Sequence, residues 1–398
     1  SSKFGKNSRF APFWSVGTGW NIHNEKFLKG SPFQLLKLRA SLGYLGNISF
    51  EPYQALTMYT SLAGLNYIKG IGAVPMGIGN KNLKWERTLS ANLGLDLTMF
   101  KGRWDFSADV YVKNTDNLLL DITKAPSLGI TTSRENVGEV ENHGFEFQTR
   151  VIPIKNKDWE WSLSLNYAYN KNKIKKISNA LREQNEKNQA KGGVTPLPIY
   201  EEGQSLTALK VVSSAGIDPI TGNEVFIKRD GSLTFVYDPN DKVVYGDTTP
   251  FGMGSIGSYL TYKQFSMGMS MRYSFGGAVY NQTLASKVEG ADPRYNADER
   301  VFSSRWKEVG QQAKYKRISD SSVPMQTSRF VETNNYITLS SLSLAYEVPL
   351  TFIKRYGLKR LHLEMLANDL FYLSSVKRER GLSYPYERSV EFSVRLGF

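Results

Sequence analysis

Side chains able to do chemistry are few and scattered in this 398-residue chain. It contains no cysteine, which excludes disulfides, thiolate nucleophiles and cysteine zinc sites. The three histidines, His23, His143 and His362, are widely spaced and do not predict a metal site. Residues 254–257 (GSIG) lack the full spacing of a nucleophile elbow. The residue types therefore do not predict an enzyme, a metal or a cofactor.

Two other kinds of motif could hold a ligand. The glycine pairs Gly192-Gly193 and Gly276-Gly277 are not followed by the Gly-Lys-Ser/Thr of a phosphate-binding loop. Residues 218–223 (DPITGN), with Asp230-Gly231 after them, offer oxygen ligands for calcium, but their spacing differs from that of an EF-hand. Asp-Pro and Thr-Gly are also common turn sequences. A hairpin is the better prediction for this segment.

The overall charge is basic, with 50 Lys and Arg against 37 Asp and Glu. A net charge of +13 suits a nucleic acid, an anionic membrane surface or an acidic ligand. The most basic stretch, residues 171–191, lacks interleaved aromatic residues, so it favours a solvated loop over a nucleic-acid site. Such loop cations could also meet lipopolysaccharide phosphates. Charge does not choose among these partners, and the pattern of the chain has to.

The main pattern along the chain is alternation of apolar and polar residues. In residues 89–99 the odd positions are apolar and the even positions are polar or glycine, which is typical of a strand with one apolar face. A phase change between Leu339 and Leu342 predicts a β-bulge. About twelve strands are predicted, clear ones at 89–99, 104–113, 145–151, 159–170, 265–275 and 390–398, and weaker ones at 11–22, 33–46, 206–215, 254–263, 336–348 and 361–370.

An antiparallel soluble sheet would also alternate, but three details favour a transmembrane β-barrel. The clear runs are about 10 residues long, enough to cross a bilayer at a tilt. Aromatic residues stand at their ends, as in interfacial girdles. Connections are short at 101–103 and 155–158 and long at 50–85, 171–205 and 276–335, which predicts periplasmic turns and external loops.

The alternation also assigns side chains to the two faces of the barrel. Acidic residues on the polar positions could pass for catalytic pairs, but in a barrel they belong to the water-facing side: Asp96, Asp109, Glu146, Glu160 and Glu391. Asn92 and Ser164 are predicted on the same side. The predicted lipid-facing residues are Leu93, Leu95, Ala108, Val110, Leu163, Leu165 and Met269.

Seven phrases of the chain resemble, in order and spacing, the C-terminal half of the SusC/RagA family of TonB-linked outer-membrane transporters. The match runs from about residue 4 to residue 398. Ala345 and Asp369 depart from the family pattern in conservative ways. The phrases are 36–47 (LKLRASLGYLGN), 82–86 (NLKWE), 136–146 (NVGEVENHGFE), 216–223 (GIDPITGN), 329–332 (RFVE), 342–346 (LSLAY) and 368–371 (NDLF).

The resemblance implies an all-β fold, a transmembrane antiparallel barrel of roughly 22 strands of which residues 1–398 supply the C-terminal part. The plug and N-terminal domain would lie outside this segment, and we expect the segment to need the rest of the same barrel, because unpaired edges are costly in lipid. It also implies active import of oligosaccharides, or secondly peptides, with a SusD-like surface lipoprotein and with TonB–ExbB–ExbD acting through the missing part. A surface adhesion or assembly barrel and a barrel enzyme remain alternatives.

Two sets of residues are candidates for contacts with other molecules. On the last strand, Phe392, Val394, Leu396 and Phe398 share one face and resemble the terminal signature used in outer-membrane assembly. Aromatic residues in the long loops are candidates for stacking on sugar rings or for protein contacts. They are Tyr53, Tyr59, Tyr67, Tyr200, Tyr295 and Trp306.

Overall fold

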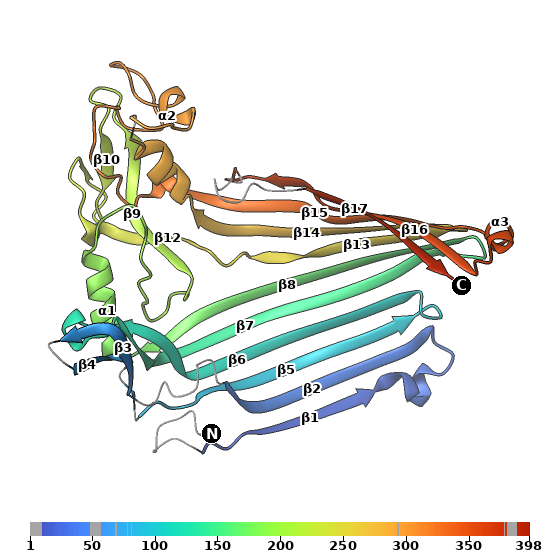
Figure 1. Ribbon diagram of the computed structural model, residues 1–398. Coiled ribbons are helices and arrows are strands. Elements are labelled where there is room, and N and C mark those ends of the chain that lie inside the picture. The colour runs from blue at the N-terminus through green and yellow to red at the C-terminus, as the bar shows by residue number, and fades with distance from the viewer. Residues whose placement is uncertain are drawn as a thin grey trace.

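A computed structural model describes residues 10–47, 57–67, 70–77, 79–80, 82–292, 294–377, 379 and 388–398. Eleven strands form one long, curved sheet, and a compact group of smaller elements stands at one end of it (Figure 1). Within the described ranges, no helix is long and apolar enough to cross a membrane.

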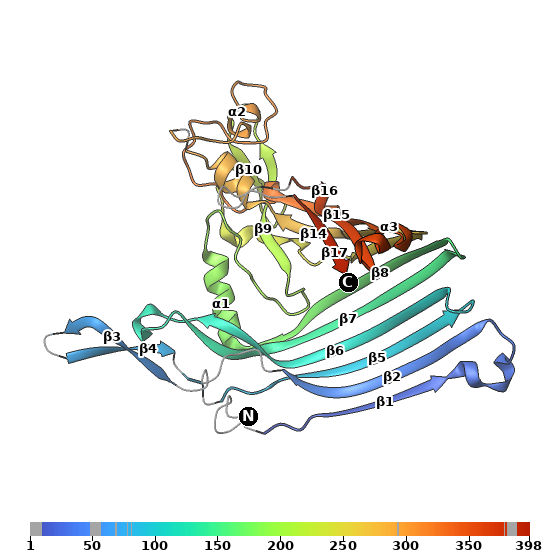
Figure 2. The ribbon, with the colours of Figure 1, turned by 45° about the vertical axis from the view of Figure 1, so that its right-hand side comes forward.

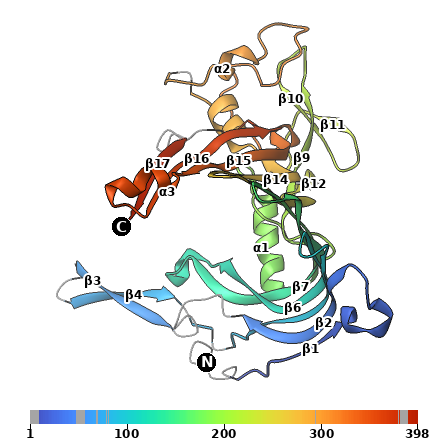
Figure 3. The same cartoon turned by 90° about the vertical axis from the view of Figure 1, so that its right-hand side faces the viewer.

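The main sheet has eleven strands, all antiparallel, in the order β1-β2-β5-β6-β7-β8-β13-β14-β15-β16-β17. Each strand pairs with the next sheet strand along the chain, so β1 and β17 form the two edges (Figure 3). The strands are β1 (Trp14–Asn21), β2 (Phe33–Asn47), β5 (Glu86–Met99), β6 (Trp104–Thr123), β7 (Thr132–Lys155), β8 (Trp159–Ile177), β13 (Gly252–Tyr262), β14 (Phe265–Tyr280), β15 (Val331–Glu347), β16 (Arg360–Ser374) and β17 (Ser389–Gly397).

The register keeps apolar side chains on one face of the whole sheet. Leu95 pairs with Leu38 on one side and with Ala108 on the other, and Ala108 pairs with Phe147. Because side chains alternate along each strand, this row of partners lies on one face and the polar residues between them lie on the other. We call these the apolar face and the polar face. Leu93 and Val110 on the apolar face are 52% and 57% exposed.

Two predictions about the strands are corrected. Segment 206–215, counted among about twelve barrel strands, is β9 (Ala208–Ile217) of a separate four-stranded sheet. Its consecutive residues Lys210, Val211 and Val212 are all buried, so both faces are covered and its pattern differs from that of a wall strand. The strands predicted at 104–113 and 145–151 are longer than predicted: β6 and β7 continue through most of 114–143, because polar residues also pair as strands beyond the apolar zone.

The connections differ sharply between the two ends of the sheet. The short-turn end carries the β1–β2, β5–β6, β7–β8, β13–β14 and β15–β16 connections, whose helical turns are η2 (Ile22–Asn24), η3 (Lys26–Leu28), α3 (Leu350–Ile353) and η8 (Lys354–Tyr356). The predicted turns 101–103 and 155–158 both lie there (Figure 1). The long-loop end carries the β3–β4 hairpin, η4 (Pro126–Leu128) and the elements described next; the hairpin is β3 (Met58–Tyr67) and β4 (Gly70–Gly77).

A compact unit stands at the long-loop end, and we call it the cap. It comprises the described residues of 178–251, between β8 and β13, and of 281–330, between β14 and β15 (Figures 1 and 2). Its elements are α1 (Asn179–Ala190), β9, β10 (Glu224–Ile227), β11 (Leu233–Thr234), η5 (Pro239–Asp241), β12 (Lys242–Asp247), η6 (Leu284–Glu289), α2 (Arg300–Ser303) and η7 (Ser328–Phe330). Its small sheet has the order β11-β10-β9-β12.

The predicted bulge in β15 is confirmed. The pairing of β15 with both neighbours shifts between Leu339 and Ser341, which leaves Ser340 as the extra residue. A one-residue shift moves the following residues to the other face, so Leu342 and Leu344 rejoin the apolar face. The alternation of the sequence records this insertion directly.

Candidate functional site: the cap and the polar face of the wall

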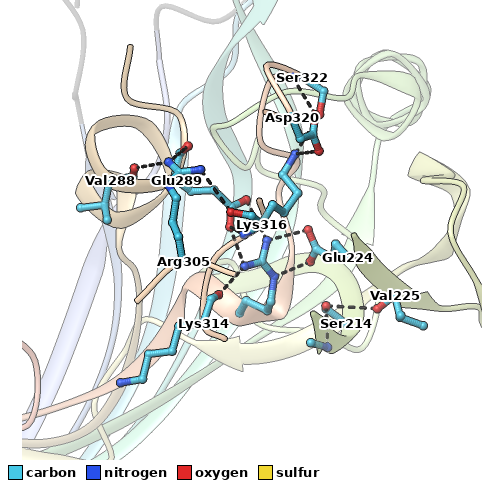
Figure 4. A network of polar contacts seen from close by, with 12 residues as sticks. Ser214, Glu224, Val225, Val288, Glu289, Arg305, Lys314, Lys316, Asp320 and Ser322 are labelled. Carbon is cyan, nitrogen blue, oxygen red and sulfur yellow. Dashed lines mark hydrogen bonds and ion pairs between the residues drawn. The ribbon is translucent and has the colours of Figure 1, made fainter. Parts of the chain in front are cut away.

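Arg329 is the centre of the cap. Its guanidinium donates to both oxygens of Glu224, at 2.7 and 2.6 Å, and to both oxygens of Glu289, at 2.7 and 2.8 Å. The carboxylates come from β10 and from the end of η6, so one side chain joins both halves of the cap (Figure 4). Burial alone would lower the pKa of Arg329, but the two carboxylates outweigh it and raise this pKa above its ordinary value.

A second buried guanidinium holds the surrounding backbone. Arg305 donates to the carbonyl oxygens of Val301 and Val288, both at 2.8 Å, and to that of Glu289 at 2.5 Å. Beside it, the Lys316 ammonium lies 2.9 Å from a carboxylate oxygen of Asp320 (Figure 4). The bonds from Arg305 satisfy carbonyl groups of the short helical turns η6 and α2, where such groups lack partners within the turn.

Lys242 at the start of β12 performs the same task for α1. Lys242 is 1% exposed. Its ammonium donates to the carbonyl oxygens of Asn188, Gln189 and Lys191 at 3.1, 3.0 and 2.8 Å. A cation at a helix C-terminus meets the negative end of the helix dipole. Burial lowers the pKa of Lys242 to about 8, so the group is still mostly charged near neutral pH.

The segment 218–223 forms a turn, as predicted. Asp218 accepts hydrogen bonds from the backbone N–H and the hydroxyl of Thr221, at 3.0 and 2.6 Å, and these bonds lower its pKa. Gly222 has φ +71°, and a Cβ there would lie 2.6 Å from the Trp306 ring. Among the described residues, no three His, Asp or Glu side chains lie close enough to hold a metal ion.

The structure does not bring the six predicted loop aromatics together. Tyr53 lies outside the described residues, and of Tyr67 only the backbone, in β3, is described. Tyr59 is exposed on the β3–β4 hairpin, away from the cap (Figure 2). Tyr200 packs against the apolar cluster of Ile122, Val137 and Leu181, where burial raises its pKa.

The other two aromatics are in the cap but do different things. The Trp306 indole N–H donates to the carbonyl of Pro219 at 2.9 Å, so this ring holds the 218–223 turn. Tyr295 is 73% exposed and lines a cavity of about 850 Å³ together with Thr283, Ser286 and Asn296. Among the four of these aromatic side chains that the structure describes, only Tyr295 is both exposed and part of the lining of this cavity.

The carboxylates around this cavity are already paired. Arg294 lies 2.6 Å from Asp292, and Arg300 lies 2.7 Å from Asp298 and 2.8 Å from Glu379. The hydrogen bonds from Arg294 lower the pKa of Asp292 to about 2. The groups left to meet a ligand are hydroxyl, amide and aromatic groups, together with Lys287.

On the polar face of the main sheet, one arginine bridges three strands. Arg39 of β2 lies 2.7 Å from Asp96 of β5 and 3.0 Å from Asp109 of β6. The guanidinium lies across Gly94, where a Cβ would come within 2.6 Å of it and within 2.5 Å of Asp109. A nearby hollow of about 470 Å³ is lined by both polar and apolar side chains, with Gln148 and Asn166 among the polar ones. The prediction that these acidic residues occupy the polar side of the strands is confirmed.

Several of these residues carried no signal in the sequence. Glu224, Glu289, Lys242 and Arg305 belong to no motif, and their partners are distant along the chain. Arg329 stood in the phrase 329–332, which marked it without indicating its role. Phe392 on β17 and Phe398 directly after it are each 78% exposed, and Val394 and Leu396 between them are also exposed. The use of these residues in assembly stays a prediction.

A curved antiparallel sheet with one exposed apolar face, one polar face and long loops at one end is the wall of a transmembrane β-barrel. Residues 1–361 match the family model described as TonB dependent receptor-like, beta-barrel, and the chain belongs to this family of integral outer-membrane proteins. The apolar face therefore contacts lipid.

Named relatives agree with this family. TonB-dependent receptor P3 of Formosa agariphila is 31% identical over 93% of this chain and 38% of its own length. TonB-dependent receptor SusC of Bacteroides thetaiotaomicron is 30% identical over 72% of this chain and 30% of its own length. The structure of the RagAB peptide transporter superposes with a TM-score of 0.80 at 23% identity, covering 94% of this chain and 41% of that chain, which shows a shared fold. The chain thus spans well under half of each relative.

Proposed function

We propose that residues 1–398 form the C-terminal wall and part of the external cap of a TonB-dependent transporter that imports nutrient oligomers. Two observations together carry this proposal. The wall has one polar face, and its long-loop end carries a cap that is held together by buried ion pairs. The plug, the N-terminal domain and the contact with TonB–ExbB–ExbD would belong to the rest of the same barrel protein. No residue described above forms a catalytic arrangement, and we propose a transporter and not an enzyme.

The long-loop end is proposed to face outward, because outer-membrane barrels carry their longer loops outside the cell. A tag at Lys187, exposed on α1, should be labelled on intact cells, and a tag at Asn156, in the β7–β8 turn, should be labelled only after the membrane is opened. Labelling of Asn156 alone on intact cells would reverse this orientation.

A SusD-like lipoprotein is the proposed partner at the cap. This lipoprotein would close over the mouth of the barrel and would need a rigid surface to contact. The Arg329 network makes the cap rigid, and its buried charges are paired with one another. Exposed apolar cap residues such as Phe235, Val236 and Phe302 are available for that contact. A single substitution at one of these three residues should reduce, but not abolish, the amount of lipoprotein that co-purifies with the barrel.

Oligosaccharide is the first proposed substrate and peptide the second. The cavity beside Tyr295 offers an exposed ring for stacking on a sugar face and hydroxyl and amide groups for its hydroxyls. Peptide backbones use similar groups, so the cavity alone does not decide between the two.

Growth experiments test both the function and this order. A strain lacking the gene should grow poorly on one class of oligosaccharide as sole carbon source and normally on monosaccharide. Tyr295→Ala should lower uptake of that oligosaccharide while surface expression stays unchanged, and Tyr59→Ala, on the separate hairpin, is the matched control. A defect on oligopeptides with normal growth on every glycan would reverse the order, and normal growth on both classes would refute import.

A further inference from the structure

The short-turn end carries an excess of positive charge that the wall does not use. Its five connections contain nine Lys or Arg residues against two acids, Glu25 and Asp158, whereas the whole chain has 50 against 37. All nine basic side chains are exposed, and none forms an ion pair with a carboxylate within the described residues. They are Lys26, Lys29, Lys101, Arg103, Lys157, Lys263, Lys354, Arg355 and Lys359.

Four of these cations gather around neighbouring connections. Lys263 belongs to the β13–β14 turn, and Lys354, Arg355 and Lys359 belong to the β15–β16 connection. The two connections are adjacent, because the backbone N–H of Glu347 donates to the carbonyl of Gln264 at 2.9 Å. At the other side, the N–H of Lys359 donates to the carbonyl of Gly397 in β17 at 2.8 Å.

The carboxylates of this region are occupied on the polar face. Glu347 is bonded by Arg360 at 2.8 Å and by His362 at 2.9 Å, and Glu364 is bonded by Arg395 at 2.9 Å. Among the described residues, the four cations are therefore left without a carboxylate partner. The positive charge of these four side chains favours binding of an anion from outside the protein.

An apolar groove opens on the lipid-facing side directly next to these cations. It has a volume of about 490 Å³ and runs across β13 to β17. It begins at Tyr262 and Phe265, beside the β13–β14 turn, and reaches Met365, roughly 20 Å from Lys359 at about 3.3 Å per residue. Its lining is almost entirely apolar and includes Tyr262, Phe265, Tyr346, Met267, Met365 and Phe392. The Lys263 ammonium lies 5.4 Å from the centre of the Tyr262 ring, which places a cation at the rim of the groove.

The connection between β15 and β16 is itself shaped for a membrane surface. Leu350, Phe352 and Tyr356 are 54%, 65% and 65% exposed, while Ile353 is buried and fixes α3 to the wall. Exposed apolar side chains next to Lys354 and Arg355 are typical of a segment lying in the interface of an anionic membrane.

We infer that this groove and its four cations form a binding site for one anionic phospholipid, with an acyl chain in the groove and the headgroup phosphate among Lys263, Lys354, Arg355 and Lys359. The inference rests on the proposed function only for the orientation, because the periplasmic leaflet of an outer membrane is the one made of phospholipid. The proposed ligand is a membrane lipid and not free phosphate, because the groove would have no role in holding a soluble anion.

The test uses the complete transporter that carries these residues, purified in mild detergent and offered equal amounts of dimyristoyl phosphatidylglycerol and phosphatidylethanolamine. Retained lipid is counted by native mass spectrometry. Replacing Lys263, Lys354, Arg355 and Lys359 by Gln should reduce the preference for phosphatidylglycerol at least about fivefold. The matched control replaces Lys26, Lys29, Lys101 and Arg103 by Gln, which removes the same amount of charge from the β1–β2 and β5–β6 connections. This control should change the preference for phosphatidylglycerol less than about twofold.

A third variant separates the groove from the charge. Met365→Trp fills the groove but faces lipid, so the barrel should keep its heat-modifiable migration while phosphatidylglycerol retention falls. Equal losses in the two charge variants, displacement by inorganic phosphate, or a preference for lipid A would each overturn the site. Because the assay measures binding and not uptake, its failure is distinguishable from failure of the proposed transport.

Discussion

Val110 on the main sheet is 57% exposed, whereas Glu289 in the cap is 4% exposed. The wall presents apolar side chains outward because its solvent there is lipid, and it is held by backbone ladders along long strands. The cap stands beyond the membrane and encloses charged side chains that pair with one another. One chain thus contains two regions with opposite rules for what may be buried, and each rule can be tested separately.

The largest expected effect is in the cap. Arg329→Ala leaves Glu224 and Glu289 buried without their cation, which should lower the free energy of opening the cap by about 3–5 kcal/mol. Hydrogen exchange should show amides of β9 to β12 losing protection while those of β5 and β6 do not. Arg294→Ala, which removes an exposed pair, should leave this protection unchanged. Equal loss of protection in the wall strands would show that cap and wall unfold together.

The next effect tests the rule of the wall. Val110→Arg near the middle of the apolar face should cost about 2–4 kcal/mol of unfolding free energy, measured by denaturant titration in lipid vesicles. Asn92→Arg on the polar face should cost less than about 1 kcal/mol, because its side chain lies in water beside the Asp109 carboxylate. Similar costs at the two positions would contradict the assignment of the faces.

A smaller effect concerns the cation at the end of α1. Lys242→Met removes the donor from three carbonyl groups and should lower the stability of α1 by about 1–3 kcal/mol. Amide exchange in α1 is the measurement, and Lys187→Met, exposed on the same helix, should stay within about 0.5 kcal/mol of the native protein. An unchanged α1 in the Lys242 variant would mean that water replaces the ammonium without cost.

The smallest effect is a pH dependence at Asp320. Burial raises the pKa of this carboxyl, but hydrogen bonds from Ser322 and Lys316 outweigh it and lower the pKa to about 2. The unfolded form then binds a proton first, so this contribution to stability is fully present above about pH 5 and is lost as the pH falls toward 2. Because the group is partly exposed and solvent screens it, the loss should be only about 1 kcal/mol. Asp320→Asn should remove this dependence in exchange measured near Lys316. An unaltered acid profile in that variant would place the titration elsewhere.

The sequence predicts the wall well and the cap poorly, for a physical reason. A strand in lipid has to alternate, so Leu93, Leu95 and the bulge at Ser340 are written in the local pattern. Cap residues are selected by partners far along the chain, as with Glu224 and Arg329, and no short window contains that information. Segment 206–215 was misplaced because an apolar strand buried on both sides resembles a wall strand when only its composition is considered.

The Arg329 network also has a consequence for how such proteins diversify. Glu224 lies in the excursion between β8 and β13, whereas Glu289 and Arg329 lie in the one between β14 and β15. A recombination event that exchanges one excursion alone separates a buried charge from its partner, and its product is destabilised from the start. Exchange of both together preserves the network, so the two excursions should be inherited as one block and should be exchanged together in chimeras built to change the cargo of the proposed transporter.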